Sequence, residues 1–257
     1  MAGMNAVTVI DVANDFRPRI SAGDAATTRL KSLLDVVRTR DAEGILRLAL
    51  TEQFAGGSAI VSSFGSESAV LLHLVAKVDP AAPILFLNTG KLFGETLRYR
   101  DRLQDQLGLI DIRAIGPHPA DRAQLDPEGT LWARNTDSCC GFRKVEPLSR
   151  ALAGFEAVVT GRKQFQTRTR SAMQGVEYVG STYRFNPLWN WSRADIDVYF
   201  EAHNLPKHPL VDDGYASIGC MPCTRRLEAG ETYREGRWAG QARDECGIHR
   251  GVDGDGI

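Results

Sequence analysis

The stretch Ser58-Ala-Ile-Val-Ser-Ser-Phe-Gly-Ser-Glu-Ser68 decides the fold, because a short β-rich apolar run leads there into a loop of small residues. Residues 69–78 follow at once and are strongly apolar, with the length of a buried helix. An apolar strand, a tight loop and an apolar helix in this order form the basic unit of an α/β protein. We therefore predict a buried strand that ends at the small-residue loop.

Three more apolar runs repeat this arrangement along the chain. We predict strands at residues 83–90, 110–115 and 157–161, with helices at residues 94–107 and 139–152 between them. Strands that alternate with helices favour a parallel sheet covered by helices on both faces. The predicted fold class is α/β.

The segment that follows the fourth strand has two local signals. Residues 176–188 alternate in a way that favours a β-hairpin or an edge addition to the sheet. Ser192 is a good helix cap for residues 193–203, and Asp195 at the third helical position supports it. A further helix is therefore expected after the hairpin.

The two ends of the chain have weaker patterns. Residues 1–23 are expected to form an N-terminal arm, followed by two helices that are broken near Gly44. Residues 206–257 are rich in Gly, Pro and charge, so we predict an irregular C-terminal segment held by side-chain or metal contacts. Residues 24–205 remain as one α/β domain.

Composition excludes several classes of function. Of the 257 residues, 43% are hydrophobic and 25% are charged, as in ordinary globular proteins, and a net charge of −1 gives no global attraction to nucleic acid. No apolar run approaches the ~20 residues of a membrane helix, and the N-terminus lacks a signal-peptide pattern. We expect a cytoplasmic protein without nucleic-acid or membrane partners, in which paired cysteines bind metal or do redox work.

The five cysteines fall into two pairs and one single residue. Cys139 and Cys140 are adjacent, Cys220 and Cys223 form a C-x-x-C pair, and Cys246 stands alone near the C-terminus. Two pairs of thiols with one thiol left over indicate a tetrathiolate metal site plus a free nucleophile.

Zinc, an iron–sulfur cluster and no metal are the alternatives for the two pairs. Adjacent side chains diverge, which is awkward for one tetrahedral ion but suits the separate iron atoms of a cluster. The pattern therefore favours iron–sulfur over zinc, with Met221 and Pro222 expected to form an apolar cover.

Two features indicate an anionic substrate. The loop Ser62-Ser-Phe-Gly-Ser-Glu-Ser68 can offer backbone N–H groups and a helix N-terminus to a phosphate or sulfate, although it could also be only a tight turn. Gly161-Arg-Lys-Gln-Phe-Gln-Thr-Arg-Thr-Arg170 packs four cations directly after a predicted strand, where α/β sheets bind ligands. Further cations flank the cysteines, namely Arg143, Lys144, Arg234 and Arg237. Together they favour anion binding over a solvated surface.

Cys246 is the candidate nucleophile. It precedes a glycine and stands three residues before His249, which could lower its pKa together with Arg234 and Arg237. The alternative is an inert thiol in the tail.

Most of the chain, from about residue 58 to residue 249, resembles the assimilatory adenylyl-sulfate reductases, relatives of the phosphoadenylyl-sulfate reductases. The doubled cysteine, the C-x-x-C pair and the terminal Glu245-Cys-Gly-Ile-His249 are its most specific elements. The other matching segments are Ser62-Ser-Phe-Gly, Leu87-Asn-Thr-Gly-Lys-Leu-Phe-Gly-Glu-Thr96, Arg143-Lys-Val-Glu-Pro-Leu148, Asn186-Pro-Leu188, Gly214-Tyr-Ala-Ser-Ile-Gly-Cys-Met-Pro-Cys-Thr224 and Gly236-Arg-Trp238.

The resemblance implies an adenine-nucleotide-hydrolase-like parallel sheet, which makes residues 24–205 a nucleotide-binding domain. It implies a [4Fe-4S] cluster held by Cys139, Cys140, Cys220 and Cys223. It also implies that Cys246 attacks the sulfur of adenosine 5′-phosphosulfate, expels AMP and forms an S-sulfocysteine. A thioredoxin or glutaredoxin-like reductant then releases sulfite. A homo-oligomer is compatible with the resemblance.

The resemblance also assigns roles to residues of this chain. Cys246 is catalytic, together with His249 and Lys144. The residues expected to bind the nucleotide and its phosphosulfate are Ser62, Ser63, Gly65, Leu87, Thr89, Gly161, Arg170, Arg234 and Arg237. The cluster is expected to tune sulfate binding through Lys144, because thioredoxin already brings the two electrons.

Three alternatives remain open at this point. Ser62-Ser-Phe-Gly is typical of the phosphoadenylyl branch, so the substrate could carry a 3′-phosphate, which Arg162 or Lys163 could bind. A tRNA-thiolating enzyme of related fold would need a Ser-Gly-Gly-x-Asp-Ser loop and a basic RNA-binding face, and the sequence indicates neither. A non-catalytic zinc module would not need Cys246.

Overall fold

The computed structural model describes residues 22–239 and 247–248. The predicted N-terminal arm lies outside this range, apart from its last two residues, so its extent stays a prediction. The catalytic candidates Cys246 and His249 also lie outside the described residues.

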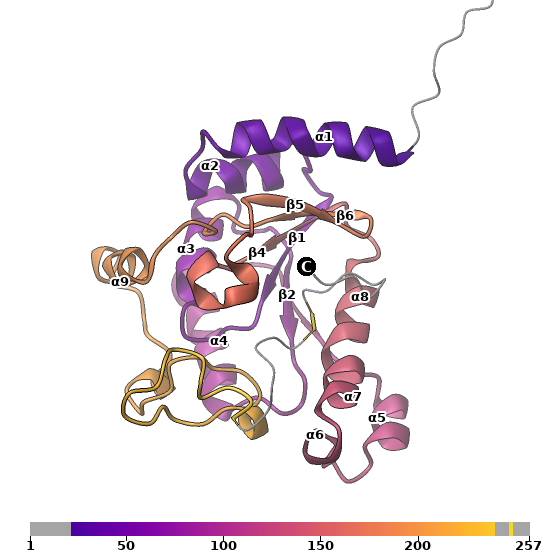
Figure 1. Ribbon diagram of the computed structural model, residues 1–257, viewed down its shortest axis with the longest axis vertical. Coiled ribbons are helices and arrows are strands. Elements are labelled where there is room, and N and C mark those ends of the chain that lie inside the picture. The colour runs from indigo at the N-terminus through magenta and orange to yellow at the C-terminus, as the bar shows by residue number, and fades with distance from the viewer. Residues whose placement is uncertain (1–21, 240–246, 249–257) are drawn as a thin grey trace, which may run out of the picture.

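One mixed sheet forms the centre of the described chain (Figure 1). Its strands are β1 (Ser58–Ser62), β2 (Ile84–Leu87), β3 (Ile112–Ile115), β4 (Ala157–Thr160), β5 (Val176–Val179) and β6 (Thr182–Phe185). Their spatial order is β3-β2-β1-β4-β6-β5. All neighbours pair in parallel except β5, which lies antiparallel to β6 at the edge. The four predicted strands and the hairpin are confirmed.

The strand order reverses between β1 and β4. The chain runs from β1 out to β2 and β3, then returns to place β4 on the other side of β1, with Val61 opposite Thr160. In open α/β sheets the loops diverge at such a point and leave a crevice at the carboxyl ends of the strands. Here those ends are Ser62 and Thr160.

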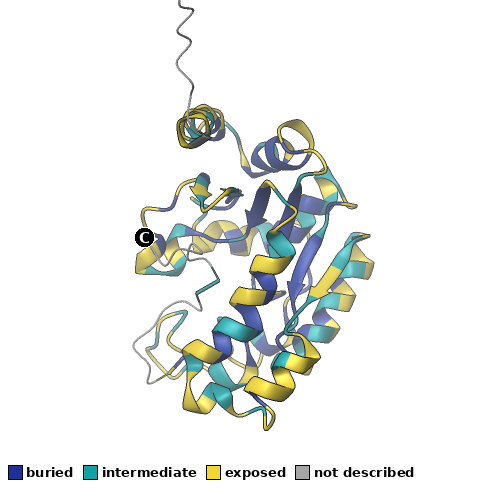
Figure 2. Cartoon of the chain, turned by 90° about the vertical axis from the view of Figure 1, so that its right-hand side faces the viewer, coloured by how far each residue is buried: buried dark blue, intermediate teal, exposed yellow. Residues whose placement is uncertain are grey.

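Helices cover both faces of the sheet, as predicted. On one face α3 (Ser68–Val78) packs between α4 (Gly94–Leu107) and α9 (Arg193–Ala202). On the other face α8 (Glu146–Leu152) lies against β2 and β3. Figure 2 shows the central strands as buried and the outer sides of the helices as exposed.

The β2 sequence explains how one strand serves two cores. Ile84 and Phe86 point into the large core under α3 and α4, whereas Leu85 and Leu87 belong to a smaller cluster with Leu148 of α8. Successive strand residues face opposite sides of a sheet, so a continuous apolar run is needed where both sides are covered.

The N-terminal helices differ from the prediction in where they break. They are α1 (Ala22–Val37) and α2 (Ala42–Arg47), and a π-helical turn (Leu48–Glu52) continues α2. The predicted break near Gly44 is wrong. The Asp41 side chain accepts a hydrogen bond of 2.7 Å from the Gly44 backbone N–H, so Asp41 begins the second helix and Gly44 lies in its first turn.

The predicted helix at residues 139–152 is confirmed, but it is not regular. It consists of α7 (Thr136–Cys140), a π-helical turn (Gly141–Val145) and α8. Two short helices precede it that the sequence did not indicate, α5 (Pro119–Leu125) and α6 (Leu131–Arg134). The π-helical turn directly follows the cysteine pair, and such turns are frequent at functional sites.

Helix α9 begins as predicted. The Ser192 backbone N–H donates to Asp195 Oδ2 at 2.7 Å, and Ser192 Oγ accepts from the Asp195 backbone N–H at 3.2 Å. This reciprocal capping fixes the position of Arg193, the first residue of the helix.

Residues 206–239 are irregular, with short 3-10 turns at Pro209–Val211 and Met221–Cys223. Side chains hold this segment to α4. The Tyr99 hydroxyl donates to the Pro206 carbonyl at 2.8 Å, and His208 Nε2 lies 3.0 Å from Thr96 Oγ1. The division of the chain at residue 206 stays a prediction. None of the helices in the described ranges is long and apolar enough to cross a membrane.

Candidate functional site

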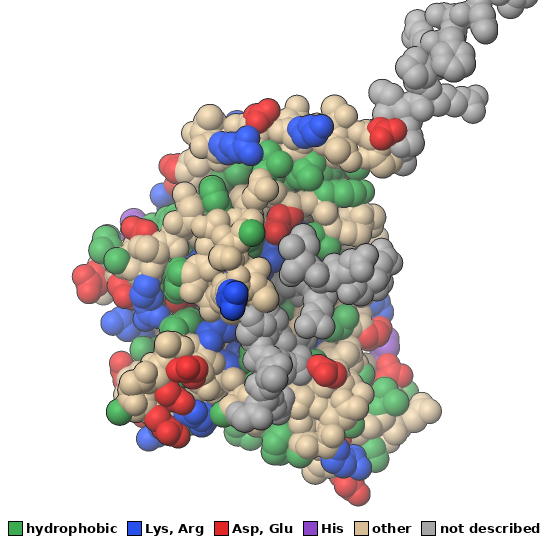
Figure 3. All heavy atoms as spheres, in the orientation of Figure 1, with side chains coloured by type: hydrophobic (Ala, Val, Ile, Leu, Met, Phe, Trp, Pro, Cys, Tyr) green, Lys and Arg blue, Asp and Glu red, His purple; other side chains and the backbone are tan. Residues whose placement is uncertain are grey.

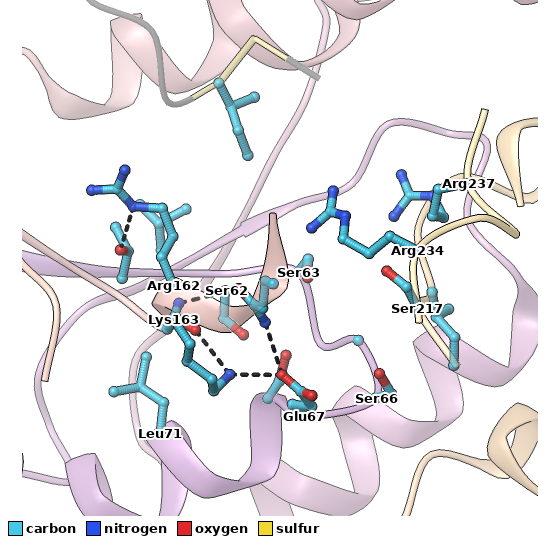
Figure 4. A pocket seen from close by; sticks show the side chains of 18 of the residues that line it. Ser62, Ser63, Ser66, Glu67, Leu71, Arg162, Lys163, Ser217, Arg234 and Arg237 are labelled. Carbon is cyan, nitrogen blue, oxygen red and sulfur yellow. Dashed lines mark hydrogen bonds and ion pairs between the residues drawn. The ribbon is translucent and has the colours of Figure 1, made fainter. Parts of the chain in front are cut away.

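A cavity of about 840 Å³, counted with its open mouth, lies at the carboxyl ends of β1 and β4. We call it the strand-end cavity. The β1–α3 loop, the loop after β4 and the C-terminal segment line it together (Figure 4). Residues from distant parts of the chain therefore meet at the switch point of the sheet.

The strand-end cavity brings together most of the residues that the sequence assigned to substrate binding. Those that line it are Ser62, Ser63, Gly65, Leu87, Gly161, Arg170, Arg234 and Arg237. Thr89 and Lys144 lie elsewhere, at the cysteines. Ile248 also lines the strand-end cavity, and in the sequence it stands between Gly247 and His249.

The β1–α3 loop is held in an unusual conformation. Phe64 has a positive φ of 49°, which is uncommon for a bulky residue, and its buried ring packs edge-on against Phe86 at 5.2 Å. The Phe64 backbone N–H donates to Ser62 Oγ at 3.2 Å. The ring anchors the loop in the core, so the small residues that follow can face the cavity.

The C-terminal segment packs directly on this loop. A Cβ atom on Gly65 would lie only 3.1 Å from the Ile218 carbonyl oxygen, so a side chain there would push the two segments apart. Ser66 Oγ donates to the Ala216 carbonyl at 2.7 Å and lies 3.1 Å from the Tyr233 hydroxyl. The walls of the cavity are therefore bonded to each other.

Sequence reasoning missed Glu67, a buried carboxylate in the cavity wall. It pairs with Lys163 Nζ at 2.8 Å, accepts from Gln166 Nε2 at 2.8 Å and lies 3.4 Å from Arg193 (Figure 4 shows the pair with Lys163). Burial alone would raise the pKa of Glu67, but these partners, Lys163 above all, lower it. Glu67 is therefore ionised and compensates Lys163.

Arg162 is also matched with a carboxylate. Its guanidinium pairs with Glu177 on β5 and donates from Nε to Thr160 Oγ1 at 3.2 Å. It reaches Asn186 Oδ1 at 3.1 Å. The two cations that directly follow β4 thus both hold carboxylates of the protein.

Arg237, in contrast to Arg162 and Lys163, does not hold a carboxylate among the described residues. Across the described residues it makes no ion pair, and its guanidinium lies over the Trp238 ring at 4.3 Å. Arg234 lies over the same ring at 5.6 Å. Figure 3 shows Lys and Arg side chains near the middle of this face of the molecule, and Figure 4 shows Arg234 and Arg237 beside the β1–α3 loop. The cavity is suited to an anion.

The four paired cysteines line a second, smaller cavity, which we call the cysteine cavity. It also contains Lys91, Trp132, Thr136, Arg143, Lys144 and Pro222. Met221 does not line it and is 54% exposed, so the expected cover by Met221 is wrong, and the Trp132 ring takes its place. The 3-10 turn sends neighbouring side chains in different directions, which explains the difference.

The chain just after β2 brings the two cysteine pairs together. Cys220 forms an isolated bridge with Leu92, and the Met221 backbone N–H donates to the Lys91 carbonyl at 2.7 Å. Thr89 Oγ1 lies 3.2 Å from Cys220 Sγ. The chain just after β2 therefore positions the C-x-x-C pair next to α7.

The thiols of the cysteine cavity lie among cationic side chains, because Lys91, Arg143 and Lys144 line the same cavity. Burial and the neighbouring Cys140 raise the pKa of Cys139 to about 11, although Arg143 opposes the shift. Arg143 is itself buried and held by Asp126 at 2.6 Å and by the Thr89 carbonyl at 2.8 Å. Its Nε has no hydrogen-bond partner, so it could donate to a sulfur ligand.

The described residues do not by themselves define a metal site. Among the described residues, no group of three or more His, Cys, Asp or Glu side chains could hold a metal ion. The four thiols nevertheless surround one cavity.

The fold and its two cavities define an α/β protein with a cavity lined by several cations beside a cavity lined by four cysteines. The profile of the phosphoadenosine phosphosulfate reductase domain matches residues 57–226. The chain therefore belongs to the phosphoadenosine phosphosulfate reductase family, a family of oxidoreductases that act on sulfur groups. Membership of this family confirms the resemblance that we inferred from the sequence.

Similar proteins cover most of the chain. The adenosine 5′-phosphosulfate reductase of Mesorhizobium japonicum is 51% identical over 80% of this chain and 81% of its own length. That of a Chelativorans species is 48% identical over 81% of this chain and 85% of its own length. Among solved structures, the phosphoadenylyl-sulfate reductase of Candida auris in complex with phosphate has a TM-score of 0.67 at 25% identity, and covers 77% of this chain and 97% of its own.

Proposed function

We propose that the chain reduces adenosine 5′-phosphosulfate to sulfite and AMP in sulfate assimilation. Family membership and the names of the most similar relatives support this substrate and reaction. The observation that carries the proposal is the position of Ile248. It lines the strand-end cavity with Ser62, Arg234 and Arg237, and in the sequence it follows Cys246 by two residues.

In the first step the Cys246 thiolate attacks the sulfur of the phosphosulfate. An S–S bond forms, the bond from sulfur to the bridging phosphate oxygen breaks, and AMP leaves with the electron pair. The enzyme retains an S-sulfocysteine. The negative charge that develops on AMP needs fixed cations, and Arg234, Arg237 and Arg170 face the same cavity.

In the second step a thiolate of thioredoxin, or of a glutaredoxin-like protein, attacks the Cys246 sulfur. Sulfite leaves and a mixed disulfide forms. The second thiol of the reductant then releases Cys246, so the dithiol supplies both electrons. Two displacements replace one difficult reduction.

The remaining site residues are assigned by the cavity that each of them lines. Ser62, Ser63, Gly65, Leu87 and Gly161 would bind the nucleotide, because they form the strand ends and the small-residue loop. His249 would assist Cys246. Thr89 lies against Cys220, so its position favours a role in holding the cysteine cavity rather than the nucleotide.

The matched cations favour a substrate without a 3′-phosphate. Lys163 is almost fully buried and holds Glu67, and Arg162 holds Glu177. If either cation bound a further phosphate, its interaction with the protein carboxylate would weaken, which is costly for the buried Glu67. These pairs support adenosine 5′-phosphosulfate over its 3′-phosphorylated form.

The cysteine cavity supports a [4Fe-4S] cluster as the resident cofactor. Cys139, Cys140, Cys220 and Cys223 would hold it, since they surround one cavity beside a buried guanidinium nitrogen that has no other partner. When bound, the cluster would supply local charge rather than electrons, because the reductant brings two. Lys144 lines the cysteine cavity and would relay this charge to the sulfate.

The proposed chemistry bears on where the protein is located. A reductant of the thioredoxin type and reduced cysteines both suit the cytoplasm. A homo-oligomer is retained as a proposal from the resemblance alone.

The experiment is to incubate the purified, reduced protein with adenosine 5′-phosphosulfate in the absence of reductant. We expect a sulfonate adduct on Cys246 by peptide mass spectrometry, one AMP released per adduct, and sulfite only after thioredoxin is added. Cys246→Ser should form no adduct and keep the same iron content and visible absorption. A wild-type protein that binds the nucleotide and never gains the adduct would refute the mechanism. Competition between the two nucleotides then tests the substrate.

A further inference from the structure

Arg237 connects the two cavities. Its guanidinium lines the strand-end cavity, while its Nε donates to the Cys223 carbonyl at 3.3 Å. Arg237 also forms an isolated bridge with Thr224, the residue after the C-x-x-C pair. The position of this cation in the substrate cavity therefore depends on the chain that carries two of the cysteines.

Gly219, the residue before Cys220, borders the same guanidinium. A Cβ atom on Gly219 would lie 2.4 Å from Nη2, 2.5 Å from Cζ and 2.6 Å from Nη1 of Arg237. Contacts this short are not tolerated, so any side chain at this position displaces the guanidinium. Gly219 has no positive φ that would require glycine for backbone reasons. The space that it leaves for the Arg237 guanidinium is therefore a structural reason for glycine at this position.

The guanidinium also lies over the ring of Trp238. The indole ring lies 4.3 Å from Cζ, and the Trp238 backbone has a positive φ of 50°, which is strained for a bulky aromatic residue. A strained Trp and a glycine thus both border one guanidinium. A cation without an ion pair among the described residues is fixed at the edge of an anion-binding cavity, and its freedom is reduced before the ligand arrives.

We propose that Gly219 is a positioning residue for the substrate: its missing side chain sets where Arg237 meets the phosphosulfate. The inference rests on the proposed function and deepens it. It makes the segment Gly219–Cys223 serve both cavities, because Cys220 and Cys223 line the cysteine cavity while Gly219 sets the position of Arg237 in the strand-end cavity.

The test is Gly219→Ala, compared with Arg237→Ala and with the double variant. In Gly219→Ala the clash involves the flexible end of Arg237, so the protein should fold with unchanged melting temperature, iron content and visible absorption. We expect the KM for adenosine 5′-phosphosulfate to rise by about tenfold or more, the loss typical of one charge-assisted hydrogen bond, with a smaller change in kcat.

The double-variant comparison distinguishes positioning from a general structural effect. If Gly219 acts through Arg237, adding Gly219→Ala to Arg237→Ala should weaken substrate binding no further. Gly154→Ala is the matched control, because a Cβ atom there would meet nothing within 4 Å. An additive double variant, or an unchanged KM in Gly219→Ala, would overturn the inference. A wild-type protein that does not bind the nucleotide would instead count against the proposed function.

Discussion

Glu67 and Lys163 form an ion pair of 2.8 Å in the wall of the strand-end cavity, with side chains only 7% and 2% exposed. Removing one partner of such a pair leaves a buried charge without compensation, which typically costs about 3–5 kcal/mol. We therefore expect Glu67→Gln to lower the free energy of unfolding by about 3 kcal/mol, measured by urea denaturation.

A second substitution checks the cause. Glu67→Gln combined with Lys163→Met removes both charges and should recover much of the lost stability. Glu156→Gln is the control, since this carboxylate is 72% exposed and should change the free energy of unfolding by less than about 0.5 kcal/mol. The ion-pair explanation fails if Glu67→Gln is as stable as the control.

The pair Arg162–Glu177 predicts a change in substrate selectivity. In Glu177→Gln the Arg162 charge is no longer matched by its partner on β5, so a ligand with an additional phosphate should bind relatively better. We expect the affinity for adenosine 3′,5′-bisphosphate to rise about fivefold relative to AMP, which is about 1 kcal/mol. Competition binding measures this ratio. An unchanged ratio would mean that Arg162 does not face the 3′ position.

His208 predicts a pH dependence of stability. Burial lowers its pKa from 6.5 to about 4, with Glu95 opposing, and its Nδ1 accepts a hydrogen bond of 3.2 Å from the Leu210 N–H. The unfolded chain therefore binds a proton more readily than the folded one. The stabilisation is complete above the unfolded pKa and is lost as the pH falls toward the folded pKa.

Between pH 7.5 and pH 4.5 we expect the free energy of unfolding to fall by up to about 3 kcal/mol because of His208. His208→Asn keeps an acceptor for the Leu210 N–H but does not titrate, so its stability should depend less on pH. Urea midpoints of both proteins across this range give the comparison. Equal pH slopes would rule out a contribution from His208.

Ser192 should make a smaller and purely local contribution. Its side chain caps α9 by accepting from the Asp195 N–H, and loss of such a cap typically costs about 1 kcal/mol. Ser192→Ala should lower the melting temperature by a few degrees and leave the iron content unchanged. Ser171→Ala is suited as a control, because Ser171 caps no α-helix and its hydroxyl donates to the Arg168 carbonyl in an exposed 3-10 turn.

The local sequence was sufficient for the elements of the sheet. The strands β1, β2 and β4 are buried on both faces of the sheet. Such a strand needs consecutive apolar residues, and a continuous apolar run can be recognised in the sequence. Ser192 and Asp195 likewise marked the start of α9 because a helix cap needs only residues three apart. The break before α2 was misplaced, since a cap by Asp41 overrode the low helix propensity of Gly44.

The cysteines and cations could be named from the sequence because thiols and guanidinium groups are rare enough to stand out in pairs and clusters. Which cations are available to a ligand could not be read in this way. Arg162, Lys163 and Arg237 look alike in the sequence, yet the first two hold carboxylates of the protein and the third does not pair with any in the described residues.

The sequence by itself determined the class of fold, the elements of the sheet and the residue types of the chemistry, because each depends on neighbours along the chain. Only the tertiary structure decided which side chains share a cavity. It matched Glu67 with Lys163, placed Thr89 at Cys220, and set Gly219 against Arg237. These contacts join residues far apart in sequence, and their energies depend on burial and distance, which exist only once the chain has folded.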